Sequence, residues 1–93
     1  LAYAAAMASG LEGVRNKIEP PLMFEGDVYS AKDLPSIPTS LEQALELFRE
    51  SEFAKKSFGE DVHRHYIRFF EVEIESFQAA VTDWELRRYF ERI

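Results

Sequence analysis

The chain has 93 residues, of which 46% are hydrophobic and 14% aromatic, so it is composed like one small folded domain or a piece of a larger one. Seventeen acidic against eleven basic side chains give a net charge of −6, which is unsuited to binding the phosphate backbone of nucleic acid. The absence of cysteine excludes disulfides, zinc–thiolate sites and thiol catalysis, and no apolar run approaches the ~18 residues that a membrane span needs.

Residues 1–18 predict a helix that is rich in small apolar side chains, with Ala at five of the first eight positions. Gly10 and Gly13 would allow another backbone to approach this helix closely. The first residue is Leu1, and no Ser, Thr, Asp or Asn precedes the helix as an N-cap. We therefore expect a piece of a longer polypeptide, with a small protein released from a tag as the alternative.

Residues 19–39 predict an extended loop, because all four prolines of the chain lie there and Pro20-Pro21 cannot continue a helix. Loops of this length are usually functional or packed against another part of the protein. Tyr29 stands in this loop among turn-forming residues, so we expect its side chain to be exposed.

Four further helices are predicted over residues 40–50, 52–58, 60–80 and 83–92. No alternating strand pattern appears, so the isolated chain, residues 1–93, is predicted to be all-α.

Local signals mark where these helices begin and end. Ser40 with Gln43 has the spacing of a capping box, although Thr39 with Glu42 offers a competing start one residue earlier. Thr82-Asp83-Trp84-Glu85 is another capping box, and Gly59 is a natural helix end.

The titratable side chains do not form a recognisable reaction centre. His63 and His65 are two residues apart on a helix and point away from each other, so they cannot clamp one metal ion, and we expect solvated or capping roles for both. Glu71 and Glu75 lie on a polar stripe, with Arg68 as the expected partner of Glu71. We assign no catalytic, cofactor-binding or metal-binding residue in this chain.

The last predicted helix contains five large apolar or aromatic residues within ten positions: Trp84, Leu86, Tyr89, Phe90 and Ile93. Two interpretations remain open for them, packing in the core of this domain and insertion into another subunit, where large aromatic residues are typical anchors. Arg87, Arg88 and Arg92 form a basic tip that either complements the helix C-terminus or meets an acidic partner.

Several segments, taken in order, resemble the bacterial glutamine synthetase family. The helix of residues 1–18 and the prolines after it resemble the segment that follows the last active-site strand of that family. Residues 25–35 resemble its following loop, residues 40–45 its next helix, and the Val-Thr-Asp-Trp-Glu run of residues 81–85 the ending of its amine-using relatives. The resemblance covers essentially all 93 residues.

The resemblance implies that the chain is the helical C-terminal part of the α+β catalytic domain of a cytoplasmic ligase of nitrogen metabolism. Such enzymes use ATP and Mg²⁺ or Mn²⁺ to join the γ-carboxylate of glutamate to ammonia, as in glutamine biosynthesis, or to an amine. In the family pattern all catalytic residues lie upstream of Leu1, so we expect this piece by itself to be inert.

The resemblance also implies homo-oligomers built as double rings, in which the C-terminal helix anchors one ring to the other. For the isolated piece we expect a dimer or a higher oligomer, because its apolar faces lack their covering partner. Tyr29 stands at the position that some family members modify by adenylylation, but its flanking residues differ here. Two readings compete with the ligase: a free-standing helical interaction module and an oligomerisation piece without an enzyme parent. The DNA immediately upstream of Leu1 separates them.

Overall fold

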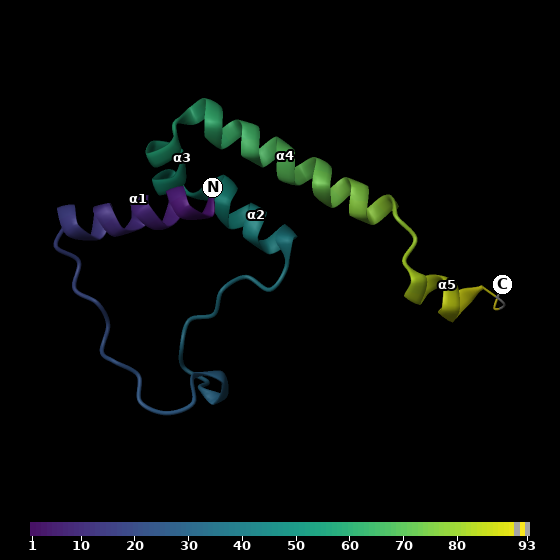
Figure 1. The fold of residues 1–93 in the computed structure, drawn as a ribbon, viewed down its shortest axis with the longest axis horizontal. Helices are drawn as coiled ribbons and strands as arrows, with labels where there is room; N and C mark the ends of the chain where they lie inside the picture. The colour runs from purple at the N-terminus through teal and green to yellow at the C-terminus, as the bar shows by residue number, and fades with distance from the viewer. Residues whose placement is uncertain (91, 93) are drawn as a thin grey trace. The chain divides into compact units, whose positions relative to one another are not determined.

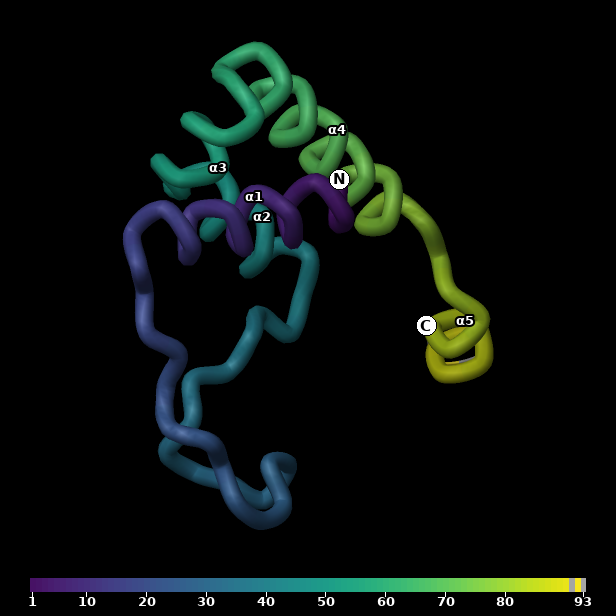
Figure 2. Tube along the Cα trace, turned by 60° about the vertical axis from the view of Figure 1, so that its left-hand side comes forward, coloured from purple at the N-terminus to yellow at the C-terminus, as the bar shows by residue number. Residues whose placement is uncertain are grey.

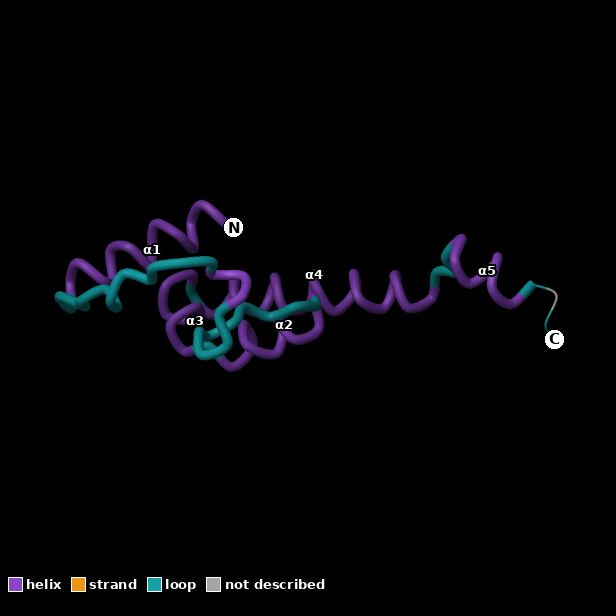
Figure 3. The backbone as a smooth tube through the Cα atoms, turned by 90° about the horizontal axis from the view of Figure 1, so that it is seen from below, coloured by secondary structure: helices purple, strands orange, loops and turns teal. Residues whose placement is uncertain are grey.

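The protein, seen here as a computed structural model, is built from helices joined by short links and one long loop (Figure 1). The structure describes residues 1–90 and 92, and within that part it contains no strand (Figure 3). Its α-helices are α1 (Ala2–Arg15), α2 (Leu41–Glu50), α3 (Glu52–Phe58), α4 (Glu60–Ala79) and α5 (Asp83–Tyr89). The all-α prediction is therefore confirmed.

The chain divides into two compact units, Leu1–Ile37 and Pro38–Ile93. Unit 1 consists of α1 and the loop that follows it, and unit 2 contains helices α2 to α5. Across the described residues, no helix combines the length and the apolarity required to cross a membrane.

Helix α1 ends at Arg15, three residues before the predicted end and before the two prolines are reached. The backbone N–H of Lys17 donates to the carbonyl oxygen of Val14, and that of Ile18 to the carbonyl oxygen of Gly13, at 3.4 and 3.0 Å. With Lys17 at a φ of 51°, these bonds form a Schellman ending. The helix therefore ends because Lys17 adopts the left-handed backbone conformation. The expectation that Pro20-Pro21 stops the helix is wrong.

Unit 1 buries none of its residues, so α1 presents its apolar side chains to the surface of the unit. Tyr3, Met7 and Val14 are all more than two-thirds exposed. A Cβ added at Gly10 or at Gly13 would meet nothing within 4 Å, so the open surface that these glycines were predicted to leave is present in the structure.

Unit 2 has a small core to which three helices each contribute one buried residue: Leu45 from α2, Ala54 from α3 and His63 from α4. Helix α4 packs against both α2 and α3. Helix α2 runs antiparallel to α4, because Phe48 near its end contacts His63 near the start of α4, whereas Leu41 at its start lines one hollow with Ile74 and Phe77 from the second half of α4.

His63 joins α4 to the end of α2. Its Nε2 donates a hydrogen bond to the carbonyl oxygen of Phe48 at 2.7 Å, and its ring lies 4.8 Å from the ring of Phe48. This carbonyl belongs to the last turn of α2, where it also accepts a hydrogen bond from the backbone N–H of Ser51 at 3.3 Å. Of the solvated or capping roles expected for the histidines, the capping role is found for His63, of which only 6% is exposed. His65 is exposed.

The predicted helix starts agree with the observed caps. Ser40 accepts a hydrogen bond from the backbone N–H of Gln43, while the Gln43 side chain accepts from the backbone N–H of Thr39. Both bonds of the Thr82–Glu85 capping box form, at 3.3 and 2.8 Å. Between α3 and α4, Gly59 has φ 87° and ψ 155°, a backbone conformation that is essentially restricted to glycine.

The apolar stripe of α4 is covered only along part of its length. Ile67, Phe70 and Ile74 are half-buried, as expected for a core-facing stripe. Phe77 and Val81, which continue the same spacing, are 68% and 66% exposed. The stripe therefore extends beyond what α2 and α3 cover within unit 2.

Replacing His63 tests whether its contact with Phe48 holds the helices of unit 2 together. His63→Ala removes the donor to the Phe48 carbonyl and the packed ring, so we expect the free energy of unfolding to fall by ~1–3 kcal/mol in urea titrations followed by circular dichroism. His65→Ala, two residues away at an exposed position, is the control and should change it by less than ~0.5 kcal/mol. Equal effects of the two substitutions would contradict the role given to His63.

Candidate functional site

The loop of unit 1 carries Tyr29 at the tip of a short turn. The 3-10 helix η1 (Val28–Ser30) forms this turn, and Figure 2 shows it at the far end of the loop that leaves α1. Asp27 holds the turn: its Oδ1 accepts from the backbone N–H of Tyr29 at 3.0 Å and its Oδ2 from the Ser30 hydroxyl at 2.7 Å. Tyr29 is 100% exposed, as predicted. The short polar turn explains this, because it directs the ring outward without any covering residue.

Charged side chains on α2 and α4 form ion pairs with each other. Arg49 contacts Glu46 within α2 and bridges to Glu71 of α4 at 2.8 Å. The predicted pair between Arg68 and Glu71 is present at 3.3 Å, and Arg68 also approaches Glu75 at 3.7 Å. Glu71 is half-buried in this network and is not simply solvent-facing. The network links helices and shows no carboxylate held apart for acid–base chemistry.

The described residues do not offer a site for the divalent cations that the family resemblance implies. No group of three or more His, Asp or Glu side chains that could hold a metal ion occurs among them. The buried His63 already uses its Nε2 in the bond to Phe48.

Helix α5 exposes its large side chains. Trp84, Leu86, Tyr89 and Phe90 are 63%, 50%, 52% and 78% exposed, and Ile93, the fifth predicted contact residue, lies outside the described residues. Trp84 and Tyr89 pack only edge to face on each other, with ring centres 6.0 Å apart. Packing into the core of this domain, one of the two interpretations of the sequence, is not found for these four side chains.

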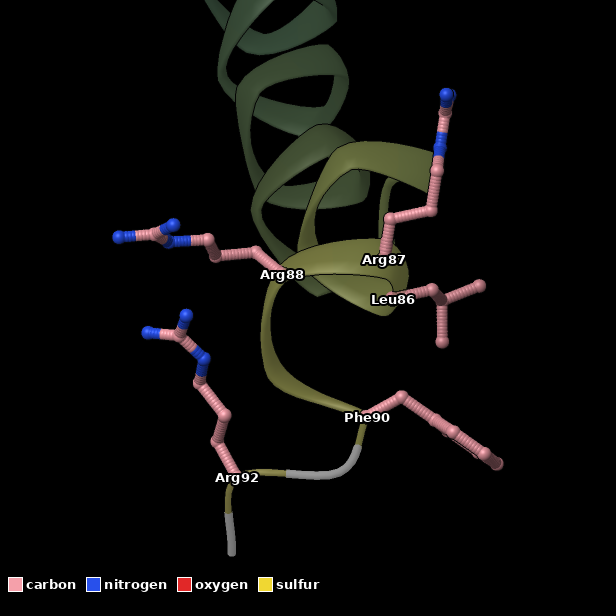
Figure 4. Close-up of a pocket in the computed structure, with 5 residues that line it drawn as sticks. All are labelled: Leu86, Arg87, Arg88, Phe90 and Arg92. Atoms are coloured by element: carbon pink, nitrogen blue, oxygen red, sulfur yellow. The ribbon is translucent and has the colours of Figure 1, made fainter.

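The apolar and the basic side chains at α5 point in different directions (Figure 4). Leu86 and Phe90 point together to one side, and we call them the α5 apolar pair. Arg88 and Arg92 point to the other side, while Arg87 projects separately, with its Nε donating to the carbonyl oxygen of Asp83. The five residues line a hollow of about 550 Å³. An apolar pair flanked by guanidinium groups is suited to a partner that is apolar in the middle and acidic at its rim.

A second hollow of about 340 Å³ lies between α2 and α4, and we call it the α2/α4 groove. Its apolar lining consists of Leu41 from α2 and of Ile74 and Phe77 from the uncovered end of α4. Glu42 and Glu73 complete the lining with two carboxylates. No sequence signal alone would have shown this groove, since its residues come from two helices about thirty positions apart.

Comparison with protein families gives a match to "Glutamine synthetase, catalytic domain" over residues 1–89. This range includes both units and α5, so the similarity is not confined to one helix.

Among individual relatives, the chain is 46% identical over its full length to γ-glutamylethanolamide synthetase GlnA4 of Streptomyces coelicolor. It is 37% identical over its full length to a glutamate–isopropylamine ligase of a Pseudomonas species, and 34% identical over 96% of its length to a glutamine synthetase of Thermotoga maritima. The chain spans 20–22% of the length of these three relatives.

Nitration of the tyrosines tests the exposure of the η1 turn. With tetranitromethane we expect Tyr29, which is fully exposed, to be modified several-fold faster than the half-buried Tyr66 of α4. Peptide mapping by mass spectrometry measures both rates in one sample, so Tyr66 serves as the internal control. A Tyr29 that reacts more slowly than Tyr66 would show that the loop is covered in solution.

Proposed function

The chain belongs to the glutamine synthetase family, and from this premise we propose that it forms the helical C-terminal part of the catalytic domain of an ATP-dependent glutamate ligase. The match over residues 1–89 and the relatives at 46%, 37% and 34% identity support the proposal. Because the chain spans about a fifth of those relatives, the remaining parts of the catalytic centre would come from the rest of the polypeptide.

The proposed reaction proceeds in two steps. A γ-carboxylate oxygen of glutamate attacks the terminal phosphorus of ATP and releases ADP, which leaves an acyl phosphate. An amine nitrogen then attacks the acyl carbon, phosphate leaves with the bonding electrons, and the nitrogen loses a proton to give the amide. Divalent cations would supply charge neutralisation at the phosphates. The ATP and glutamate that this reaction consumes are cytoplasmic metabolites, which supports a cytoplasmic location.

An amine, rather than ammonia, is the nucleophile that we propose. Two relatives whose names state an amine or its amide product, isopropylamine and ethanolamide, are 37% and 46% identical to this chain over the aligned residues. The relative from Thermotoga maritima that is named only as a glutamine synthetase is 34% identical. The ending Val81-Thr82-Asp83-Trp84-Glu85 also resembles the amine-using branch.

Within this enzyme the chain would act as a structural part whose helix α5 makes contacts between subunits. The observation that carries this role is the exposure of Trp84, Leu86, Tyr89 and Phe90 within seven consecutive positions. Burying a side chain of this size contributes roughly 2–3 kcal/mol, so several together can outweigh the cost of ordering a helix at an interface. We extend the proposal to Ile93, three residues after Phe90 in the sequence, and to the double ring that the family resemblance implies.

We retain Tyr29 as the candidate modification site of the chain. Its full exposure and its place at the tip of a turn held by Asp27 support access by a modifying enzyme. The different flanking residues argue that such an enzyme would read another sequence than the one in adenylylated relatives.

The ligase proposal is tested with the complete polypeptide encoded by the gene. We expect release of ADP and phosphate that depends on glutamate and on an added amine, with ethanolamine and isopropylamine giving a γ-glutamyl amide by mass spectrometry. Ammonia, offered separately, should be the poorer nucleophile. The 93-residue chain alone is the matched control and should show no turnover. A gene that encodes only these residues, or a complete polypeptide without glutamate-dependent phosphate release, would overturn the proposal.

The contact role of α5 is tested by placing a charge in its apolar pair. In the complete enzyme Phe90→Asp removes roughly 2–3 kcal/mol of apolar burial at each contact and buries a carboxylate, so the assembly should dissociate into smaller species in sedimentation velocity. Ser57→Asp adds the same charge at an exposed position of α3 and should leave the assembly intact. An enzyme that stays fully assembled with Phe90→Asp would show that α5 is not an anchor.

A further inference from the structure

The α2/α4 groove and the α5 apolar pair belong to the same unit and carry charges of opposite sign. The groove combines the apolar Leu41, Ile74 and Phe77 with the carboxylates of Glu42 and Glu73. The α5 apolar pair is flanked by guanidinium groups. Opposite charges beside two apolar surfaces favour their encounter and fix the orientation in which they pack.

The carboxylates of the groove are available for a contact of this kind. Among the described residues, ion pairs join the cations Arg49, Lys55, Arg64 and Arg68 to the anions Glu46, Glu60, Asp61, Glu71 and Glu75. Neither Glu42 nor Glu73 has a Lys or Arg partner in that part of the chain. A guanidinium group brought to the groove would therefore not displace an existing ion pair.

The length of the link between α4 and α5 brings α5 over the groove when the chain reverses there. The link consists of residues 80–82, and two to five residues usually connect two antiparallel helices. Leu86, five positions after the middle of the link, then lies opposite position 76, five positions before it. Phe90, nine positions after the middle, lies opposite position 72. The groove residues Glu73 and Ile74 lie between these two positions of α4.

We propose that α5 closes over the α2/α4 groove of its own chain while the subunit is unassembled. In the closed state Leu86 and Phe90, which are four residues apart and point the same way, cover Ile74 and Phe77. Arg87, which projects separately from this pair, reaches the carboxylate of Glu73. The structure describes the open state, in which the groove and the α5 apolar pair are both exposed.

The change between the two states falls on Ala80 and Val81. In the open state Ala80 is extended, with φ −81° and ψ 140°. Thr82 is extended as well, but it holds the capping box of α5 and keeps this conformation in both states. The reversal of the chain therefore uses the two residues before Thr82, which are the hinge of the closure.

The consequence of the closure rests on the contact role proposed for α5. The same apolar pair cannot pack in its own groove and on another subunit at once, so a closed subunit is protected from premature contacts. Only the open fraction of the subunits is competent to assemble, and the apparent affinity between subunits falls in proportion to that fraction.

Distances within single molecules test the closure. The chain contains no cysteine, so Ser57→Cys on the exposed side of α3 and Arg88→Cys accept a donor and an acceptor dye. Arg88 points away from the α5 apolar pair, so the dye does not enter the contact. Residue 88 lies past the end of α4 in the open state and beside its last turns in the closed state. By Förster transfer in the 93-residue chain we expect a population whose distance is shorter by more than ~10 Å.

Two substitutions should each reduce this short-distance population at least ~10-fold. Val81→Pro holds the link open, because the residue before a proline is restricted to the extended conformation that Ala80 already has. Phe77→Asp removes the receiving surface, and because this side chain is 68% exposed, α4 should persist in circular dichroism. Gln78→Asp, which adds the same charge one position along at an exposed residue, is the control and should have little effect.

Charge reversal tests the proposed ion pair of the closed state. Glu73→Arg and Arg87→Glu should each lower the closed population about threefold, and the two substitutions together should restore it. A double variant that closes no better than either single variant would overturn this arrangement of α5 in the groove.

Three results would overturn the closure: a chain without the short-distance population, equal effects of Phe77→Asp and Gln78→Asp, and transfer between separate chains. The last is measured by mixing chains labelled only at residue 57 with chains labelled only at residue 88, at the same low concentration. If the closure fails but Phe90→Asp still dissociates the assembled enzyme, the contact role of α5 stands. The ligase reaction of the complete polypeptide is measured independently of all of these results.

Discussion

The hydrogen bond from His63 to the carbonyl oxygen of Phe48 is the contact on which the arrangement of unit 2 depends. It holds the start of α4 against the end of α2 across the short α3, and the two rings pack 4.8 Å apart beside it. The apolar core around it is small, with Leu45 and Ala54 as its buried hydrophobic residues. With so little apolar surface to fix the helices, a buried hydrogen bond from one helix to the end of another has a correspondingly large share in specifying their positions.

The unequal lengths of the helices explain where unit 2 leaves apolar surface uncovered. The twenty residues of α4 extend about 30 Å, whereas the ten residues of α2 extend about 15 Å. Because the end of α2 is held at His63 near the start of α4, its beginning at Leu41 still lies short of the end of α4. Phe77 therefore remains exposed, although it continues the same apolar stripe as Ile67 and Phe70. Val81, which the sequence pattern also placed on this stripe, lies beyond the end of α4 at Ala79. The α2/α4 groove is the consequence of this mismatch.

Features that depend on neighbouring residues could be predicted from the sequence, and features that depend on distant ones could not. The caps at Ser40 and Thr82 form within three residues, so their spacing was sufficient. The ending of α1 was missed because Lys17, which is not a residue type favoured at positive φ, adopts that conformation. The burial of His63 depends on Phe48, fifteen positions earlier. A signal did exist, since His63 shares a helical face with Tyr66, Ile67 and Phe70.

The exposed apolar surfaces of the two units differ in kind, and this difference suggests what covers each of them. Helix α1 exposes small residues, and its glycines have open space where a Cβ would stand, which suits close and permanent packing against another segment of the same domain. Helix α5 exposes large aromatic side chains with arginines at their flanks, the composition of an anchor between subunits. In the ligase that we propose, the rest of the catalytic domain would cover α1 and a second subunit would cover α5. One short chain would then connect the interior of its own domain with the neighbouring molecule.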